Sequence, residues 1–192
     1  MKLPDIKILD EKQKVLHQKS KEVKFPLTDE YKKRLFDIIK YLEMSQDEKY
    51  IKKYNLRAGM GLSLVQIGIL DRAFVIANEN DDKTFEEHII INPEIIAKSE
   101  ELVYVGEGEG CLSVNREVEG IVPRHARITV KYQNLDGNFK TIRVREEISI
   151  AFQHEIDHLN GILFVDKIDP KNPYKNKEKM REIELAFFNL LI

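Results

Sequence analysis

The sequence predicts an α+β fold, in which short antiparallel or mixed β-sheets surround one central α-helix that carries candidate metal ligands. Two helical patterns stand apart in the chain, and between them lie many short apolar runs bounded by turn-forming residues. The later helix, roughly residues 146–160, has an apolar face and is expected to be buried. The chain of 192 residues contains neither a repeat nor a linker, so we expect a single domain over 1–192.

The first helix is expected to begin after Thr28, a residue type that often caps helices. Asp29 and Glu30 follow it, where negative charge suits the positive end of the helix dipole. Apolar residues then recur with a helical period, at Tyr31, Leu35, Ile38, Ile39 and Leu42. We interpret this stripe as core packing. The polar residues 45–57 that follow are expected to be exposed to solvent.

The middle of the chain contains patterns typical of short strands. Strands are expected at 72–78, around the apolar run 73–77, and at 87–92, and Asn92-Pro93 is expected to end the second strand. Further strands are expected at 102–105, 121–124 and 128–132, followed by a hairpin turn at Asp136-Gly137 and a returning strand that contains Phe139, Ile142 and Val144. The returning strand leads directly into the central helix.

The central helix contains the sequence His-Glu-Ile-Asp-His at residues 154–158. A spacing of four residues is about 40° beyond one helical turn, so His154 and His158 point the same way. Glu155 lies beside them, close enough to handle the proton of a water on a shared metal. Asn160-Gly161 is expected to end the helix. Two histidines on a surface helix could show the same spacing by chance, so the interpretation requires a third ligand.

The only cysteine, Cys111, is a candidate for that ligand. A catalytic tetrahedral site takes three protein ligands and leaves the fourth position to water. Glycines at 106, 108 and 110 precede the thiol and let the backbone come close to a ligand or another strand. A lone cysteine can equally be a small buried apolar residue, an unreactive thiol or a nucleophile.

Three segments together resemble the peptide deformylase family. They are Gly59-Met60-Gly61-Leu62-Ser63-Leu64-Val65-Gln66, similar to the family's Gly-x-Gly-x-Ala-Ala-x-Gln, then Glu109-Gly110-Cys111-Leu112-Ser113, and finally the helix motif His154-Glu155-Ile156-Asp157-His158. Their order and spacing fit, and the resemblance runs from about residue 4 to residue 168. The length of residues 45–57 resembles the longer-linker branch of the bacterial enzymes. Ser63 and Leu64 depart from the pattern, because two alanines are usual there.

The resemblance implies a metal-dependent hydrolase that removes the formyl group from the N-terminal formylmethionine of new polypeptides and releases formate. It implies that Cys111, His154 and His158 bind one divalent metal ion and that a hydroxide on this metal is the nucleophile. The metal expected from the family is Fe(II), and zinc, nickel or cobalt can substitute for it. The partner is the nascent formyl-Met polypeptide, which could be met at the ribosome.

The resemblance also implies roles for other residues. Glu155 would be the general acid and base, and the Gln66 side chain and Leu112 backbone N–H would donate hydrogen bonds to the oxyanion. The implied substrate needs an apolar pocket for its methionine side chain and a strand edge that pairs with its backbone. The candidate substrate-binding residues are Met60, Gly61, Gly110, Ile148, Ala151 and Phe152. We expect an ion pair between Glu109 and Arg124 to support the cysteine loop.

Two other classes of protein share the helix motif. A zinc peptidase would take its third ligand from a His or Glu after the helix, but the other histidines, His17, His88 and His125, all precede it. A non-catalytic protein would use the metal only to hold its fold. These alternatives stay open at the level of sequence.

Composition limits the partners and the cellular compartment that we expect for this protein. The net charge of −2 gives no sign of a nucleic-acid-binding surface, and no run of 18 apolar residues indicates a membrane span. The single cysteine excludes an intramolecular disulfide, and the first residues lack the apolar run of a signal peptide, so we expect a cytoplasmic protein. Residues 183–192 are apolar, and within 177–192 a helix and a strand are both compatible with the pattern.

Overall fold

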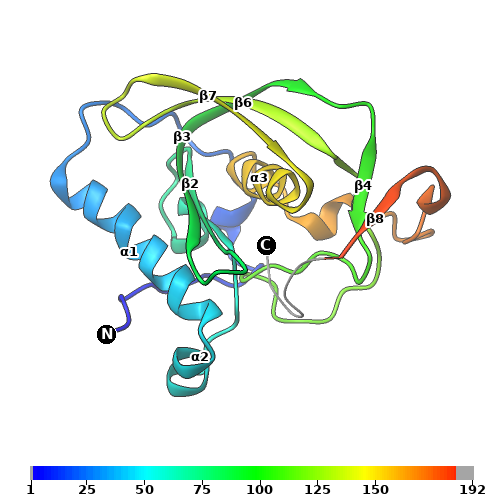
Figure 1. Cartoon of the computed structure of the whole chain (residues 1–192), viewed down its shortest axis with the longest axis horizontal. Coiled ribbons are helices and arrows are strands. Elements are labelled where there is room, and N and C mark those ends of the chain that lie inside the picture. The colour runs from blue at the N-terminus through cyan, green and yellow to red at the C-terminus, as the bar shows by residue number, and fades with distance from the viewer. Residues whose placement is uncertain (1, 185–192) are drawn as a thin grey trace.

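The computed structural model describes residues 2–184, and Figure 1 shows its arrangement. The helices are α1 (Asp29–Gln46), α2 (Glu48–Tyr54) and α3 (Glu146–Leu159), with short 3-10 helices η1 (Lys14–His17), η2 (Leu64–Ile67), η3 (Phe164–Lys167) and η4 (Lys177–Lys179). The strands are β1 (Gly61–Ser63), β2 (Ala73–Glu79), β3 (Phe85–Lys98), β4 (Leu102–Val105), β5 (Arg124–His125), β6 (Arg127–Gln133), β7 (Phe139–Arg145) and β8 (Arg181–Ile183).

The strands form two sheets around α3. The larger sheet has the order β1-β2-β3-β6-β7, and all of its pairs are antiparallel. The smaller has the order β5-β4-β8, in which β8 runs parallel to β4. In Figure 1, α3 lies near the centre, with β2 and β3 on one side and β4 and β8 on the other. The predicted α+β class, with mixed sheets around a central helix, is therefore confirmed.

The helix α1 agrees with its predicted cap and stripe. The Thr28 side chain accepts a hydrogen bond from the Tyr31 backbone N–H at 3.2 Å. Leu35, Ile38 and Leu42 are buried in an apolar cluster that they share with β1 and β2. The segment after α1 contains a second helix, α2, which the sequence did not predict. None of its residues is buried, so it carries no apolar stripe from which a helix could be recognised.

The expected end of a strand at Asn92-Pro93 is wrong, because β3 continues from Phe85 to Lys98. The register with β6 shifts between Ile91 and Glu94, and Asn92 takes a positive φ of 51°. A proline at such an irregularity loses no ladder hydrogen bond, so the strand can pass through it. The strand expected at 121–124 is also displaced, since only Arg124–His125 pairs with β4.

The helix α3 is buried on nearly all sides. Ile150, Phe152 and Leu159 are fully buried, and the Phe152 ring packs edge-on against Phe74 with 5.2 Å between centroids. The predicted stop is present, because Gly161 follows the helix with a φ of +73°. A Cβ at Gly161 would lie 2.8 Å from the backbone of His17, so glycine also permits this close approach.

The structure describes only the first part of the apolar tail. The sequence left helix and strand open here. The structure has the 3-10 helix η4 at Lys177–Lys179 and the strand β8 at Arg181–Ile183, while residues 185–192 lie outside the described part. In the part of the chain that the structure describes, no helix combines the length and the apolar character needed to cross a membrane.

Candidate metal centre

The fold brings Cys111, His154 and His158 to one buried point. One ligand atom from each lies within 4.8 Å of the others, and Cys111 Sγ lies 3.3 Å from His158 Nε2. The two histidines come from successive turns of α3, and the cysteine comes from the loop after β4. The third candidate ligand, Cys111, thus precedes the helix in the sequence, whereas a zinc peptidase with the same helix motif would take its third ligand from a residue after the helix.

Glu109 fixes the orientation of His154. The His154 Nδ1–H donates to Glu109 Oε2 at 2.9 Å, which directs the other ring nitrogen toward Cys111 and His158. His154 Nε2 has no hydrogen-bond partner among the described residues. A buried nitrogen in this position, beside a thiol and a second imidazole, fits a divalent metal of the zinc or iron type.

The expected ion pair of Glu109 and Arg124 is present. Arg124 Nε and Nη2 lie 2.7 and 2.8 Å from the two Glu109 oxygens, and Arg124 Nη1 lies 2.5 Å from Asp157 on α3. Burial raises the pKa of Glu109, but Arg124 and His154 outweigh this effect and lower it to about 2. The carboxylate is therefore charged, and the pair joins the cysteine loop to β5 and α3.

The pKa values of the two histidines shift in opposite directions. Burial lowers the pKa of His158 well below its usual value, so its imidazole is neutral, which is the form that binds metals. Burial also lowers the pKa of His154, but the contacts with Cys111 and Glu109 outweigh it and raise the pKa to about 10. The point between Cys111 and Glu109 therefore favours positive charge.

Glu155 lies beside the ligands and is fully buried. Burial raises its pKa to about 7, although nearby His154 and the Ser63 hydrogen bond both oppose this shift. The Ser63 hydroxyl donates to Glu155 Oε2, while Oε1 has no hydrogen-bond partner among the described residues. A carboxyl group that titrates near neutral pH can both take and return a proton.

Gln66 faces the same site from η2. Its Nε2 donates to Ser113 Oγ at 3.1 Å and lies 3.5 Å from Cys111 Sγ, and its Oε1 accepts from the Ser63 backbone N–H at 2.8 Å. Leu112 directly follows Cys111 in the chain. The side-chain amide therefore lies beside the cysteine loop, and the family resemblance implies an oxyanion role for both. Their roles remain predictions.

The expected substrate-binding residues lie in two settings. Met60, Ile148, Ala151 and Phe152 belong to the apolar cluster around α3, and Gly61 and Gly110 lie on β1 and in the cysteine loop. The Met60 carbonyl already accepts from the Ala77 N–H at 2.8 Å, so one of its lone pairs is used inside the sheet. Phe152 packs on Phe74, so it supports the core as well. Their contact with a substrate remains a prediction.

The two unusual residues of the first motif do not loosen its packing. Ser63 and Leu64 are 0% and 1% exposed, and Leu64 joins the apolar cluster shared with α1. The larger side chains are thus accommodated behind the loop.

One further residue contacts the site, and the sequence pattern did not indicate it. The Arg57 guanidinium donates to the carbonyl oxygens of Cys111, Leu112 and Val114 at 3.3, 3.3 and 3.0 Å, and to Asn115 Oδ1 at 2.8 Å. Arg57 therefore holds the loop that carries the cysteine. Bonds from a side chain to distant backbone carbonyls leave no mark in a sequence, so this contact could not have been predicted.

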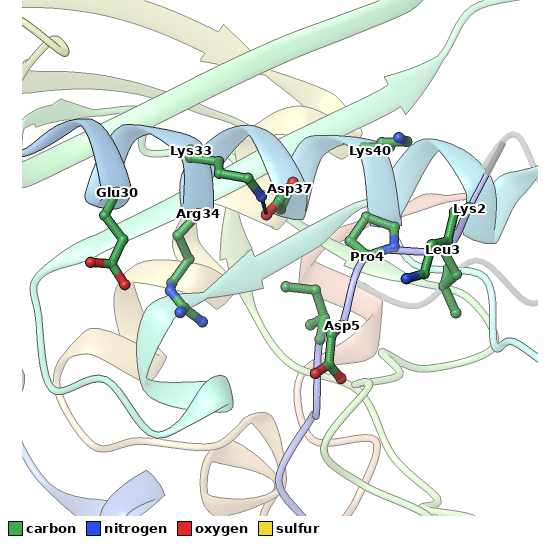
Figure 2. Close-up of a pocket in the computed structure, with 10 residues that line it drawn as sticks. Lys2, Leu3, Pro4, Asp5, Glu30, Lys33, Arg34, Asp37 and Lys40 are labelled. Atoms are coloured by element: carbon green, nitrogen blue, oxygen red, sulfur yellow. Dashed lines mark hydrogen bonds and ion pairs between the residues drawn. The ribbon is translucent and has the colours of Figure 1, made fainter.

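A separate groove lies between the N-terminal residues and α1, as Figure 2 shows. Its volume is about 530 Å³, and its lining includes Lys2, Asp5, Glu30, Lys33, Arg34, Asp37 and Lys40. Charges of both signs line this groove, and Lys33 already pairs with Asp37 at 2.6 Å. The groove contains none of the candidate ligands, so it is distinct from the metal centre.

The sequence comparisons with known proteins agree on one family. A sequence model described as polypeptide deformylase matches residues 6–174. The peptide deformylase of Ligilactobacillus salivarius is 46% identical over 161 residues, covering 82% of this chain and 87% of its own. The peptide deformylase of Limosilactobacillus fermentum is 42% identical over 180 residues, covering 92% of this chain and 95% of its own.

Solved structures agree with the sequence comparison. The crystal structure of peptide deformylase from Thermotoga maritima is similar with a TM-score of 0.68 and 31% identity, over 86% of this chain and 98% of its own. The class I type b peptide deformylase from Acinetobacter baumannii, with Met-Ala-Ser bound, is similar with a TM-score of 0.67 and 28% identity, over 85% of this chain and 98% of its own. The likeness covers most of both chains in each case.

Proposed function

Because the chain belongs to the polypeptide deformylase family, we propose that Cys111, His154 and His158 hold the divalent metal ion of a deformylase active site. The reaction is removal of the formyl group from N-terminal formylmethionine, which releases formate and a free amine. The observation that carries the residue assignment is the meeting of these three side chains at one buried point.

We infer that Fe(II) is the native metal, as the resemblance to the family implies, and that zinc, nickel or cobalt can take its place. One thiolate and two imidazoles suit all of these ions. When bound, such an ion would lower the pKa of water from about 15.7 towards roughly 7 and so would make hydroxide available near neutral pH.

The protein residues then complete the reaction. Glu155 takes the proton of the attacking water as the new C–O bond forms, and returns it to the leaving amine as the C–N bond breaks. The Gln66 side-chain amide and the Leu112 backbone N–H donate to the formyl oxygen as it becomes negative. The free Oε1 and the pKa of about 7 support this role for Glu155.

The substrate in this proposal is a nascent polypeptide that begins with formylmethionine. Met60, Ile148, Ala151 and Phe152 would line the pocket for the methionine side chain, and the backbone near Gly61 and Gly110 would pair with the peptide. The similar enzyme from Acinetobacter baumannii holds Met-Ala-Ser, which has the chemistry of the expected product. We also infer that residues 1–192 act as one catalytic domain and meet new chains in the cytoplasm, at the ribosome.

The experiment that tests the proposal measures formate release from formyl-Met-Ala-Ser by protein prepared anaerobically with Fe(II). We expect release by the wild type and a fall in kcat of about 10²- to 10⁴-fold for Glu155→Gln at equal metal content. Acetyl-Met-Ala-Ser serves as the control substrate, with the free amine measured, because its hydrolysis would release acetate instead of formate. Absence of formate from a folded, metal-loaded wild type would contradict the proposal.

A further inference from the structure

The strand β1 makes a contact with Glu155 that the mechanism above does not use. The Ser63 hydroxyl donates to Glu155 Oε2 and also lies 3.2 Å from the Glu155 backbone oxygen. Ser63 is fully buried, so water does not compete for this proton. A hydroxyl carries one proton, and its bond to a charged carboxylate is stronger than its bond to a neutral carbonyl.

Gly61, two residues earlier in the same strand, contacts the other side of the carboxylate. A Cβ at Gly61 would lie 2.5 Å from Glu155 Oε1 and 3.1 Å from its carboxyl carbon. Residues i and i+2 of a strand lie on the same face. The strand therefore contacts both carboxylate oxygens. At Gly61 the absence of a side chain makes room for Oε1, and at Ser63 the hydroxyl donates a hydrogen bond to Oε2.

The strand itself is held firmly. Gly61 pairs with Ile76 and Ser63 with Phe74 across the antiparallel ladder to β2. The Ser63 backbone N–H also donates to Gln66 Oε1 at 2.8 Å. One residue thus fixes Glu155 through its hydroxyl and Gln66 through its backbone.

We propose that Ser63 is a positioning residue for deformylation, whose hydroxyl holds Glu155 Oε2 and leaves Oε1 as the oxygen that exchanges the proton. This inference rests on the function proposed above for Glu155. An alanine at position 63 would have no hydroxyl, so the contact depends on the serine. A carboxylate held at one oxygen has one orientation, and its free oxygen stays in place between turnovers.

The test compares Ser63→Ala with the wild type as metal-loaded holoenzyme on formyl-Met-Ala-Ser. A hydrogen bond to a charged group predicts a fall in kcat of roughly ten- to a hundredfold, with KM and metal content unchanged. In the Glu155→Gln background we expect Ser63→Ala to cause no further loss, because the serine acts through Glu155. A crystal structure of Ser63→Ala should show Glu155 in more than one orientation.

Ser149→Ala is the matched control. It removes another buried hydroxyl, which bonds neutral groups instead of a carboxylate: Ser149 Oγ on α3 donates to the His125 carbonyl at 2.8 Å and accepts from Gln153 Nε2 at 3.1 Å. We expect its kcat to equal that of the wild type. A Ser63→Ala kcat within about twofold of wild type, or an equal loss in both backgrounds, overturns the inference while deformylase activity stands. A wild type without activity overturns the proposed function together with this inference.

Discussion

Glu109 is a buried carboxylate whose contacts are with charged or chargeable groups, Arg124 and His154. Removing the charge of Glu109 takes the bidentate partner from buried Arg124, which keeps only the contact with Asp157 among the described residues, and takes the counter-charge from His154. We expect Glu109→Gln to lower the free energy of unfolding by about 3–5 kcal/mol. Urea denaturation at neutral pH measures the effect.

An exposed pair provides the comparison for Glu109. Arg127 lies 3.3 Å from Glu101, with both side chains well exposed. Arg127→Gln should therefore change the free energy of unfolding by less than about 1 kcal/mol. Equal effects of the two substitutions would show that the Glu109 ion pair does not stabilise the fold.

The residues of the site differ in how far the sequence could predict them. His154 and His158 follow from helical spacing, and Cys111 follows from its glycines once the family resemblance is recognised. The contacts of Ser63 and Arg57 could not be predicted in this way. Ser63 is 92 positions from Glu155, and their meeting depends on how β1 packs against α3.

At the scale of elements, the loop that carries Cys111 depends on an arginine that lies before β1. The planar guanidinium of Arg57 donates hydrogen bonds to four acceptors on residues 111–115. A lysine cannot reproduce this fork, because its ammonium is a single point charge. We expect Arg57→Lys to release the metal about tenfold faster. Chelator competition followed by metal analysis measures the rate.

Lys52→Gln on α2 is the control for Arg57→Lys, because Lys52 is exposed and its ion pair within residues 2–184 is the local one with Glu48 at 3.1 Å. It should leave the release rate unchanged. If Arg57→Lys also retains the wild-type rate, the arginine does not determine how firmly the loop holds the ion.

Elements were predictable where burial leaves a period in the sequence. The helix α1 has a buried stripe and was found, whereas α2 has no buried residue and was not. The strand β3 passes through Pro93 because its register with β6 is irregular there, and a rule based on the proline alone cannot include that compensation.

At the scale of the whole molecule, the metal ligands join two distant parts of the chain. Cys111 follows β4 of the smaller sheet, and His154 and His158 lie on α3. An ion bound at this point stabilises the folded state, by about 4 kcal/mol when the free ion is at 1,000 times its dissociation constant. We therefore expect removal of the metal to lower the melting temperature.

Differential scanning calorimetry before and after chelation measures this change, and Fe(II), Ni(II) or Zn(II) should restore the higher value. Cys111→Ser should shrink the difference between the two forms, because one ligand is weakened. A melting temperature that does not respond to metal in the wild type would contradict a site that links the two parts of the fold.

The ends of the two sheets bear on how the molecule behaves at high concentration. Open strand edges invite pairing with another chain, and natural proteins oppose this with short strands and cationic side chains. The outer strand β8 has three residues, of which Arg181 and Glu182 are exposed. The outer strand β7 carries Lys140, Arg143 and Arg145, all exposed. The same short strand that completes the smaller sheet therefore also discourages edge-to-edge aggregation of one copy with the next.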